Sequence, residues 1–296
     1  MWVVLLLGQS AVAGFMAPAA CQALWTQTAN IWERSRQSQL IRYCDLVGSS
    51  CSKLASGDRA AKAAFEVAHE AELVLPERAE ALVVEGRALV AMGEVTRAVD
   101  ILRTAIARDS HVLDEPATRL SWARALARTG HRDEAVEAYR ELEPWVSMFH
   151  GAERSAARVE VGLALMSQGR VGLDDAVRCL RASLRDGNGD AQPVAVLVLA
   201  LAFDRRSDIS DAKDLLSTRT SGDPRERVQA DFAKAVFSIA PPDALAASAL
   251  ALEISGDRDG ALEQWDAAVD ASASTPWLDY AKGHADRLRS TRRWHP

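Results

Sequence analysis

The sequence is short of aromatic residues, of asparagine and of excess positive charge. Aromatic side chains make up 6% of the 296 residues, the two asparagines are Asn30 and Asn188, and the formal net charge is -6. An acidic chain of this kind lacks the broad basic field that nucleic-acid binding requires, so we expect no nucleic-acid partner. Hydrophobic residues reach 48%, which excludes a disordered chain, and the abundant alanine favours closely packed helices.

The sequence also lacks the motifs of common active sites. It has no Gly-x-Ser-x-Gly elbow, no phosphate-binding loop and no paired Cys-x-x-Cys ligands. His69-Glu70 begins like a zinc-protease motif, but Leu73 stands where the second histidine is needed. Ser50 and Lys53 have a Ser-x-x-Lys spacing without its companion elements. We therefore predict no catalytic residues, no metal site and no cofactor; an enzyme framed by helical repeats remains an alternative function.

Four cysteines are present, and their spacings leave several interpretations open. Cys44 and Cys51 fall at the end of an expected helix and in the following turn, where an oxidising compartment would allow a disulfide; two ordinary thiols are the alternative. Cys21 follows small residues, which suggests lipidation, although Pro18 replaces the aliphatic residue that such signals prefer. Cys179 is expected to pack within a helix.

The N-terminus carries no charged side chain before Glu33, and residues 1–21 read as a signal peptide or a membrane anchor. Ala17-Pro18-Ala19 fits a secretory cleavage site, but no lysine or arginine precedes the apolar run. An uncleaved apolar stretch to Trp25 would be long enough to span a bilayer, and the arginines after it would keep the body in the cytoplasm. We expect export to the periplasm or the bacterial cell envelope; the alternatives are a membrane-anchored protein facing the cytoplasm and a wrongly assigned start codon.

The remaining chain repeats one pattern of small and large residues around a turn. In the best-formed unit, Leu82, Gly86 and Leu89 precede the turn at Gly93, and Ala98 and Leu102 follow it. Such a pattern predicts two helices that approach closely at their small residues, joined by a glycine that leaves the helical conformation at no steric cost. The corresponding turns of the other units fall at Gly130, Gly169, near Ser207 and at Gly256.

These repeats resemble the tetratricopeptide repeat family, which prefers the same order of small and large residues. The resemblance covers roughly residues 58–273 and implies an all-α solenoid, a superhelix of about five or six helical hairpins. We divide the chain into an N-terminal signal or anchor at 1–21, a helical segment at 22–57, the repeats at 58–274, and a C-terminal capping helix and tail at 275–296. An extra helix is expected near residues 225–239, and a first helix before the repeats at residues 33–46.

The resemblance implies a non-catalytic scaffold or adaptor that holds a protein or peptide partner on the concave face of the first helices. On that face the sequence places a basic end and an apolar end; the candidate binding residues are Arg87, Arg124, Arg128, Leu163, Met166 and Leu201. The arginines suit carboxylates of an acidic partner, and the apolar side chains suit apolar anchors. The alternative is that the arginines form a solvated face and the apolar residues pack between repeats.

Overall fold

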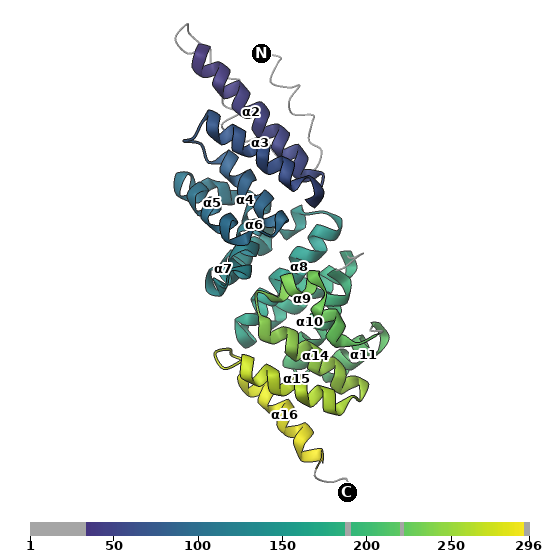
Figure 1. The fold of residues 1–296 in the computed structure, drawn as a ribbon. Helices are drawn as coiled ribbons and strands as arrows, with labels where there is room; N and C mark the ends of the chain where they lie inside the picture. Colours follow the sequence, from purple (N-terminus) through teal and green to yellow (C-terminus); the bar gives the residue numbers. More distant parts are fainter. Residues whose placement is uncertain (1–33, 187–190, 220–221, 293–296) are drawn as a thin grey trace. The chain divides into compact units, whose positions relative to one another are not determined.

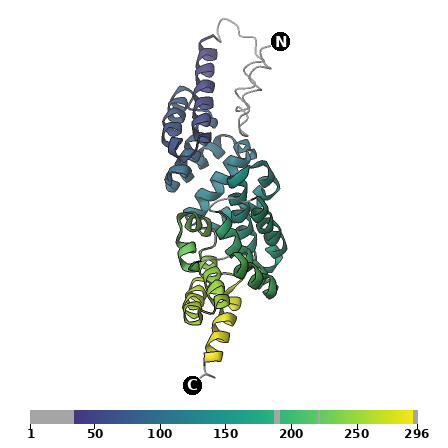
Figure 2. The same cartoon turned by 90° about the vertical axis from the view of Figure 1, so that its right-hand side faces the viewer.

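The computed structural model describes residues 34–186, 191–219 and 222–292, and these form α-helices and short 3-10 helices joined by turns (Figures 1 and 2). The chain divides into two compact units, of which the first ends at Thr129 and the second begins at Gly130. The predicted all-α fold is confirmed within each unit. The proposed cleavage site and Cys21 lie outside the described residues.

Unit 1 is built from successive helices that pair as hairpins. Its elements are α2 (Arg34–Ala55), η1 (Asp58–Ala60), α3 (Ala61–Val74), α4 (Glu80–Met92), α5 (Val95–Arg108), η2 (Ser110–Asp114) and α6 (Pro116–Arg128). Helix α2 packs against α3, and α4 packs against α5, while the first helices α2, α4 and α6 also contact one another in order. This arrangement of neighbouring hairpins is that of a tetratricopeptide-like repeat.

Unit 2 continues the hairpin pattern and adds a final single helix. Its elements are α7 (Arg132–Leu142), η3 (Glu143–Met148), α8 (Gly151–Ser167), η4 (Gly169–Gly172), α9 (Leu173–Asp186), α10 (Ala191–Arg205), α11 (Ile209–Arg219), α12 (Pro224–Gln229), α13 (Asp231–Phe237), α14 (Pro241–Ser255), α15 (Arg258–Ala271) and α16 (Leu278–Arg292). The hairpins are α8 with α9, α10 with α11, and α14 with α15; α16 packs against α15. A helix at the end of a repeat array covers an apolar face that would otherwise contact water.

The turn at Gly93 ends α4 in the left-handed conformation, with φ of 81°. The amide of Glu94 then donates to the carbonyl of Leu89, at 2.9 Å, which satisfies a carbonyl that the helix leaves without a partner. Gly256 has the same role after α14, with φ of 88°. The predicted turn positions are therefore confirmed, and the glycines are present for their backbone conformation.

The small residues of the repeat allow close helix contact. A Cβ atom added to Gly86 on α4 would lie 2.5 Å from Cγ of Leu102 on α5. The next complete hairpin has the same pair, since a Cβ on Gly162 of α8 would lie 2.7 Å from Cγ of Leu180 on α9. At equivalent positions in the two units, a leucine of the second helix therefore occupies the space that a larger side chain in place of the glycine would need.

Two boundaries differ from those that the sequence predicts. Helix α2 continues to Ala55, so the expected end near residue 46 is wrong. The extra helix expected near residues 225–239 is two short helices, α12 and α13, because the backbone of Ala230 is extended between them. Within the described ranges, no helix is both long enough and apolar enough to cross a membrane.

Candidate functional site

The predicted basic residues lie on the first helices of unit 1. Arg87 follows the packed Gly86 on α4, and Arg124 follows the buried Ala123 on α6, so the two arginines occupy equivalent places in neighbouring repeats. Arg128 lies one helical turn beyond Arg124 and is exposed. We call Arg87, Arg124 and Arg128 the arginine face.

Arg87 is held in an ion pair. Its Nη1 donates to Oε1 of Glu115 at 2.9 Å, and both side chains are largely buried. Glu115 is the N-cap residue of α6, where the positive end of the helix dipole favours a carboxylate, and it also accepts a hydrogen bond from Thr118. The ion pair therefore joins α4 to α6 and fixes the direction of the Arg87 side chain.

The apolar end of the predicted groove is not an open surface. Leu163, Met166 and Leu201 are completely buried, so they belong to the core of unit 2 and their prediction as partner-binding residues is wrong. Most residues of α10, and of α8 beyond its first turn, are buried, and α13 is one of the helices that pack against both. The chain after α15 also returns to α8, where Trp277 donates from Nε1 to the carbonyl of Met166 at 2.8 Å.

The predicted disulfide between Cys44 and Cys51 is also wrong. Both residues lie on the continuous helix α2, and Cys51 is a free, buried thiol. Seven residues of helix separate two Cα atoms by about 10 Å, which is beyond the reach of a disulfide. Burial raises the pKa of Cys51 to about 12 and that of Cys179 to about 11, so neither thiol is activated as a nucleophile.

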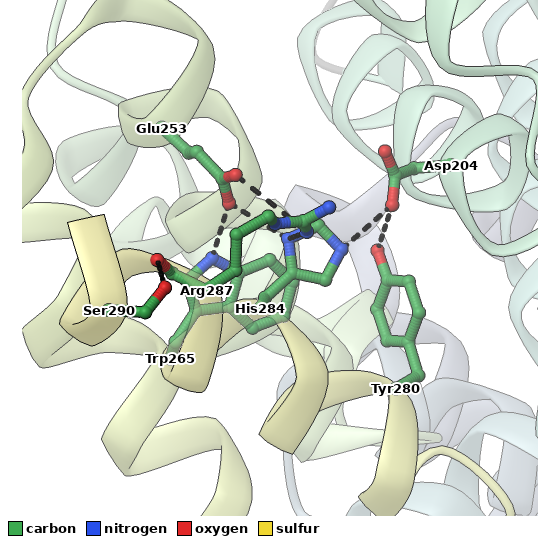
Figure 3. A network of polar contacts seen from close by, with 7 residues as sticks. All are labelled: Asp204, Glu253, Trp265, Tyr280, His284, Arg287 and Ser290. Carbon is green, nitrogen blue, oxygen red and sulfur yellow. Dashed lines mark hydrogen bonds and ion pairs between the residues drawn. The ribbon is translucent and has the colours of Figure 1, made fainter.

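A network of polar contacts in unit 2 surrounds His284 on α16 (Figure 3). Its Nε2 lies 3.0 Å from Oδ2 of Asp204 on α10, and its Nδ1 lies 2.8 Å from Oε2 of Glu253 on α14. Tyr280 donates to the same Asp204 oxygen at 2.8 Å, and Trp265 donates to Glu253 at 2.9 Å. We call this cluster the His284 network. It ties α16 to three other helices.

The charges of the network set its protonation. Burial alone would lower the pKa of His284, but the two carboxylates outweigh burial and raise it. Burial alone would raise the pKa values of Asp204 and Glu253, but hydrogen bonds from His284 lower both. A carboxylate beside each ring nitrogen gives both N–H groups of the imidazolium an acceptor and favours that form. The guanidinium of Arg287, whose Nη2 lies 2.7 Å from Nδ1, is a donor and opposes it.

This arrangement suits a structural contact better than catalysis. Both ring nitrogens of His284 face carboxylates, and its ring stacks on Trp265 with centroids 4.3 Å apart. A doubly protonated imidazole has no lone pair with which to accept a proton from a substrate. His284 therefore holds the capping helix in place, as a cation between two anions.

A second buried ion pair lies beside the network. Arg205 at the end of α10 donates twice to Asp243 at the start of α14, at 3.0 and 2.6 Å, and both side chains are buried. The guanidinium lies over the rings of Trp277 and Tyr280, with its carbon 4.4 and 5.4 Å from the two centroids. A bidentate pair under two aromatic rings keeps a buried charge compensated, and it fixes the segment that leads into α16.

Sequence periodicity did not indicate these contacts, because their members lie far apart in the chain. His284 and Asp204 are 80 residues apart, and Arg205 and Asp243 are 38 residues apart. The available signal was the charge of Asp204, Arg205 and Glu253 at the ends of otherwise apolar first helices.

One further group in the described chain, His69 with Glu72 and Glu85, has the donor atoms to hold a metal ion.

Comparison with known proteins finds no match to a family model and none to a curated protein sequence. Solved structures are similar at low identity. YrrB, described as a TPR protein with an unusual peptide-binding site, is 15% identical with a TM-score of 0.41, over 74% of this chain and 99% of that one. PilF of Pseudomonas aeruginosa is 15% identical with a TM-score of 0.45, over 83% of this chain and 99% of that one. The TPR domain of P58(IPK) is 17% identical with a TM-score of 0.36, over 93% and 74%. Similarity this distant does not identify what the present chain binds.

Proposed function

We propose that the chain is a non-catalytic adaptor that binds an acidic protein segment on the arginine face of unit 1. The observation that carries the proposal is the equivalent placement of Arg87 and Arg124 on neighbouring first helices, with Arg128 one turn further along. Guanidinium groups on adjacent helices match carboxylates spaced along an extended peptide. The resemblance of the repeats to tetratricopeptide proteins supports a protein partner over a small molecule.

The ion pair of Arg87 determines how this face can be tested. Replacing Arg87 by glutamate would place two carboxylates side by side in a largely buried position, so loss of binding would be confused with loss of folding. Arg124 is half-buried and Arg128 is exposed, so we place the charge reversal at these two positions and verify the fold of the variant by circular dichroism. The matched control is the double change of Arg59 and Lys62 to glutamate, since both residues are exposed in the same unit.

The experiment is a selection of displayed random peptides on the wild-type chain, followed by affinity measurements with the enriched peptides. We expect enrichment of peptides that carry several carboxylates. Their affinity should fall at least tenfold in Arg124→Glu with Arg128→Glu, because two attractive charges become repulsive. It should change less than twofold in Arg59→Glu with Lys62→Glu. Enrichment of apolar or basic peptides, or equal losses in the two double variants, would refute the arginine face as the binding surface.

We also propose that the adaptor acts in the bacterial cell envelope, on the basis of the apolar N-terminal residues and the small residues near Ala19. The alternative is the same adaptor anchored to the membrane and facing the cytoplasm. Mass spectrometry of the native N-terminus distinguishes them. A mature chain that begins near Ala20 or Cys21 supports export, and a fatty-acid mass on Cys21 would add lipidation. An intact N-terminus in the membrane fraction would contradict export.

A further inference from the structure

Three potential metal ligands converge between two neighbouring hairpins of unit 1. His69 and Glu72 lie one turn apart on α3, so they share a face of that helix, and Glu85 lies on the facing helix α4. One ligand atom from each side chain can be chosen so that all three lie within 4.8 Å of one another. Nδ1 of His69 and Oε1 of Glu85 are 3.3 Å apart.

Glu85 is an unusual residue for its position. Its side chain is 3% exposed, and a carboxylate so deeply buried is costly unless positive charge compensates it. Among the described residues its one hydrogen-bond contact is with His69, at 3.3 Å, which is long for a contact between charged groups. The geometry therefore leaves a buried carboxyl group with a single, long hydrogen-bond contact.

The surroundings of the group suit a bound cation. The His69 side chain is 53% exposed, so an ion can enter from solvent and keep water as a further ligand. The imidazole lies parallel to the ring of Phe65, with the centroids 6.1 Å and the planes 1° apart, and its Nδ1 faces Glu85. Glu72 lies 3.9 Å from Arg108, a separation at which the carboxylate can exchange the arginine for a metal ion.

We propose that His69, Glu72 and Glu85 form a binding site for a divalent transition metal of the Zn²⁺ type. One imidazole nitrogen with two carboxylate oxygens is a ligand set that Zn²⁺ accepts, whereas Mg²⁺ and Ca²⁺ prefer oxygen alone. Two ligands bonded to zinc at about 2.0–2.2 Å in a tetrahedron are separated by about 3.4 Å. The 3.3 Å between His69 and Glu85 already has this value, and the Glu72 carboxylate closes the third position by side-chain rotation.

The ion would join the second helix of one hairpin to the first helix of the next, because α3 and α4 each supply ligands. It would also neutralise the buried Glu85 more completely than one histidine can. We therefore assign the site a stabilising role in unit 1, independent of the arginine face.

The test is calorimetric titration of the untagged, chelator-treated full chain with Zn²⁺, and separately with Mg²⁺. We expect one saturable Zn²⁺ site, a Zn²⁺-dependent rise in melting temperature, and no comparable response to Mg²⁺. His69→Gln and Glu85→Gln should each weaken Zn²⁺ binding at least tenfold and abolish the thermal response. Both changes keep the size of the side chain, and circular dichroism verifies that the variants fold.

The matched control is His111→Gln. His111 lies 3.1 Å from Asp114 at the same spacing as His69 and Glu72, but both side chains are exposed, and no third ligand from the described residues joins them. Its replacement should leave Zn²⁺ affinity within twofold of the wild type. The proposal is wrong if the wild-type chain shows no saturable Zn²⁺ site, if His69→Gln binds as the wild type does, or if His111→Gln loses as much affinity as His69→Gln.

Discussion

Ser207 has the role in the α10–α11 hairpin that glycine has in the other turns. It is the one non-glycine residue with positive φ in the described chain, at 71°. The amide of Asp208 donates to the carbonyl of Phe203 at 2.8 Å, the same five-residue hydrogen bond that follows Gly93 and Gly256. The hydrogen bond therefore keeps the turn in a left-handed conformation that costs an L-residue about 1–2 kcal/mol.

Ser207→Gly should stabilise the chain. Glycine removes the steric cost of the left-handed turn but adds disorder to the unfolded chain, so we expect a net gain of about 0.5–1 kcal/mol. The measurement is the urea midpoint of unfolding. Ser207→Ala is the control; it keeps the steric cost and should give no gain. A Ser207→Gly variant that unfolds at lower urea than the wild type would contradict this account of the turn.

At the scale of the helix pair, two glycines in unit 1 have opposite environments. Gly86 on α4 faces Leu102, and a Cβ there would lie 2.5 Å from Cγ of that leucine. Gly48 in the interior of α2 is exposed, and a Cβ there would meet no atom within 4 Å. The same substitution therefore tests close helix packing at one position and helix propensity alone at the other.

Gly86→Ala should destabilise the chain by about 1–3 kcal/mol, because the methyl group must displace Leu102. Gly48→Ala should stabilise it by about 0.5–1 kcal/mol, because alanine loses less backbone entropy in a helix. Chemical denaturation of the two variants beside the wild type gives both values. If the two substitutions shift stability in the same direction, the hairpin register is wrong.

The hairpins could be predicted from the sequence because their evidence is local. The glycine turn and the small and large residues around it lie within about one repeat, and Gly86 and Leu102 belong to the same hairpin. The apolar end of the groove was mispredicted for the opposite reason. Leu163 and Met166 have the spacing of a surface stripe, but α13, which packs against their helix α8, and Trp277, which contacts Met166, come from distant parts of the sequence. The site of His69, Glu72 and Glu85 could not be predicted for the same reason, because Glu85 comes from the next hairpin.

At the scale of the whole chain, the two units differ in how their first helices are used. Unit 1 keeps charged side chains on that face, at Arg87, Arg124 and Arg128. Unit 2 covers the corresponding helices with α13 and with the segment leading into α16. The arginine face belongs to one unit and the His284 network to the other, so we expect changes to the His284 network to leave the arginine face intact.

The His284 network makes the stability of unit 2 depend on pH. The pKa of His284 is raised on folding, so its contribution is complete below the unfolded value near 6.5 and is lost as pH rises through the folded value. The pKa values of Asp204 and Glu253 are lowered, so their contributions are complete above about pH 4.5 and are lost as pH falls through the folded values. The free energy of unfolding should therefore be highest between about pH 4.5 and 6.5.

We expect the urea midpoint of the wild type to fall between pH 6 and 9, and that of His284→Gln to be lower at pH 6 and nearly constant over this range. Each unit by which folding raises the pKa corresponds to about 1.4 kcal/mol, so the slope measures the strength of the network. His150→Gln is the control in the same unit, because His150 is exposed at the start of α8. It should retain the wild-type profile. If the wild type shows no decline above pH 6.5, His284 is neutral in the folded chain, and the capping helix is held by Arg205, Asp243 and the aromatic contacts instead.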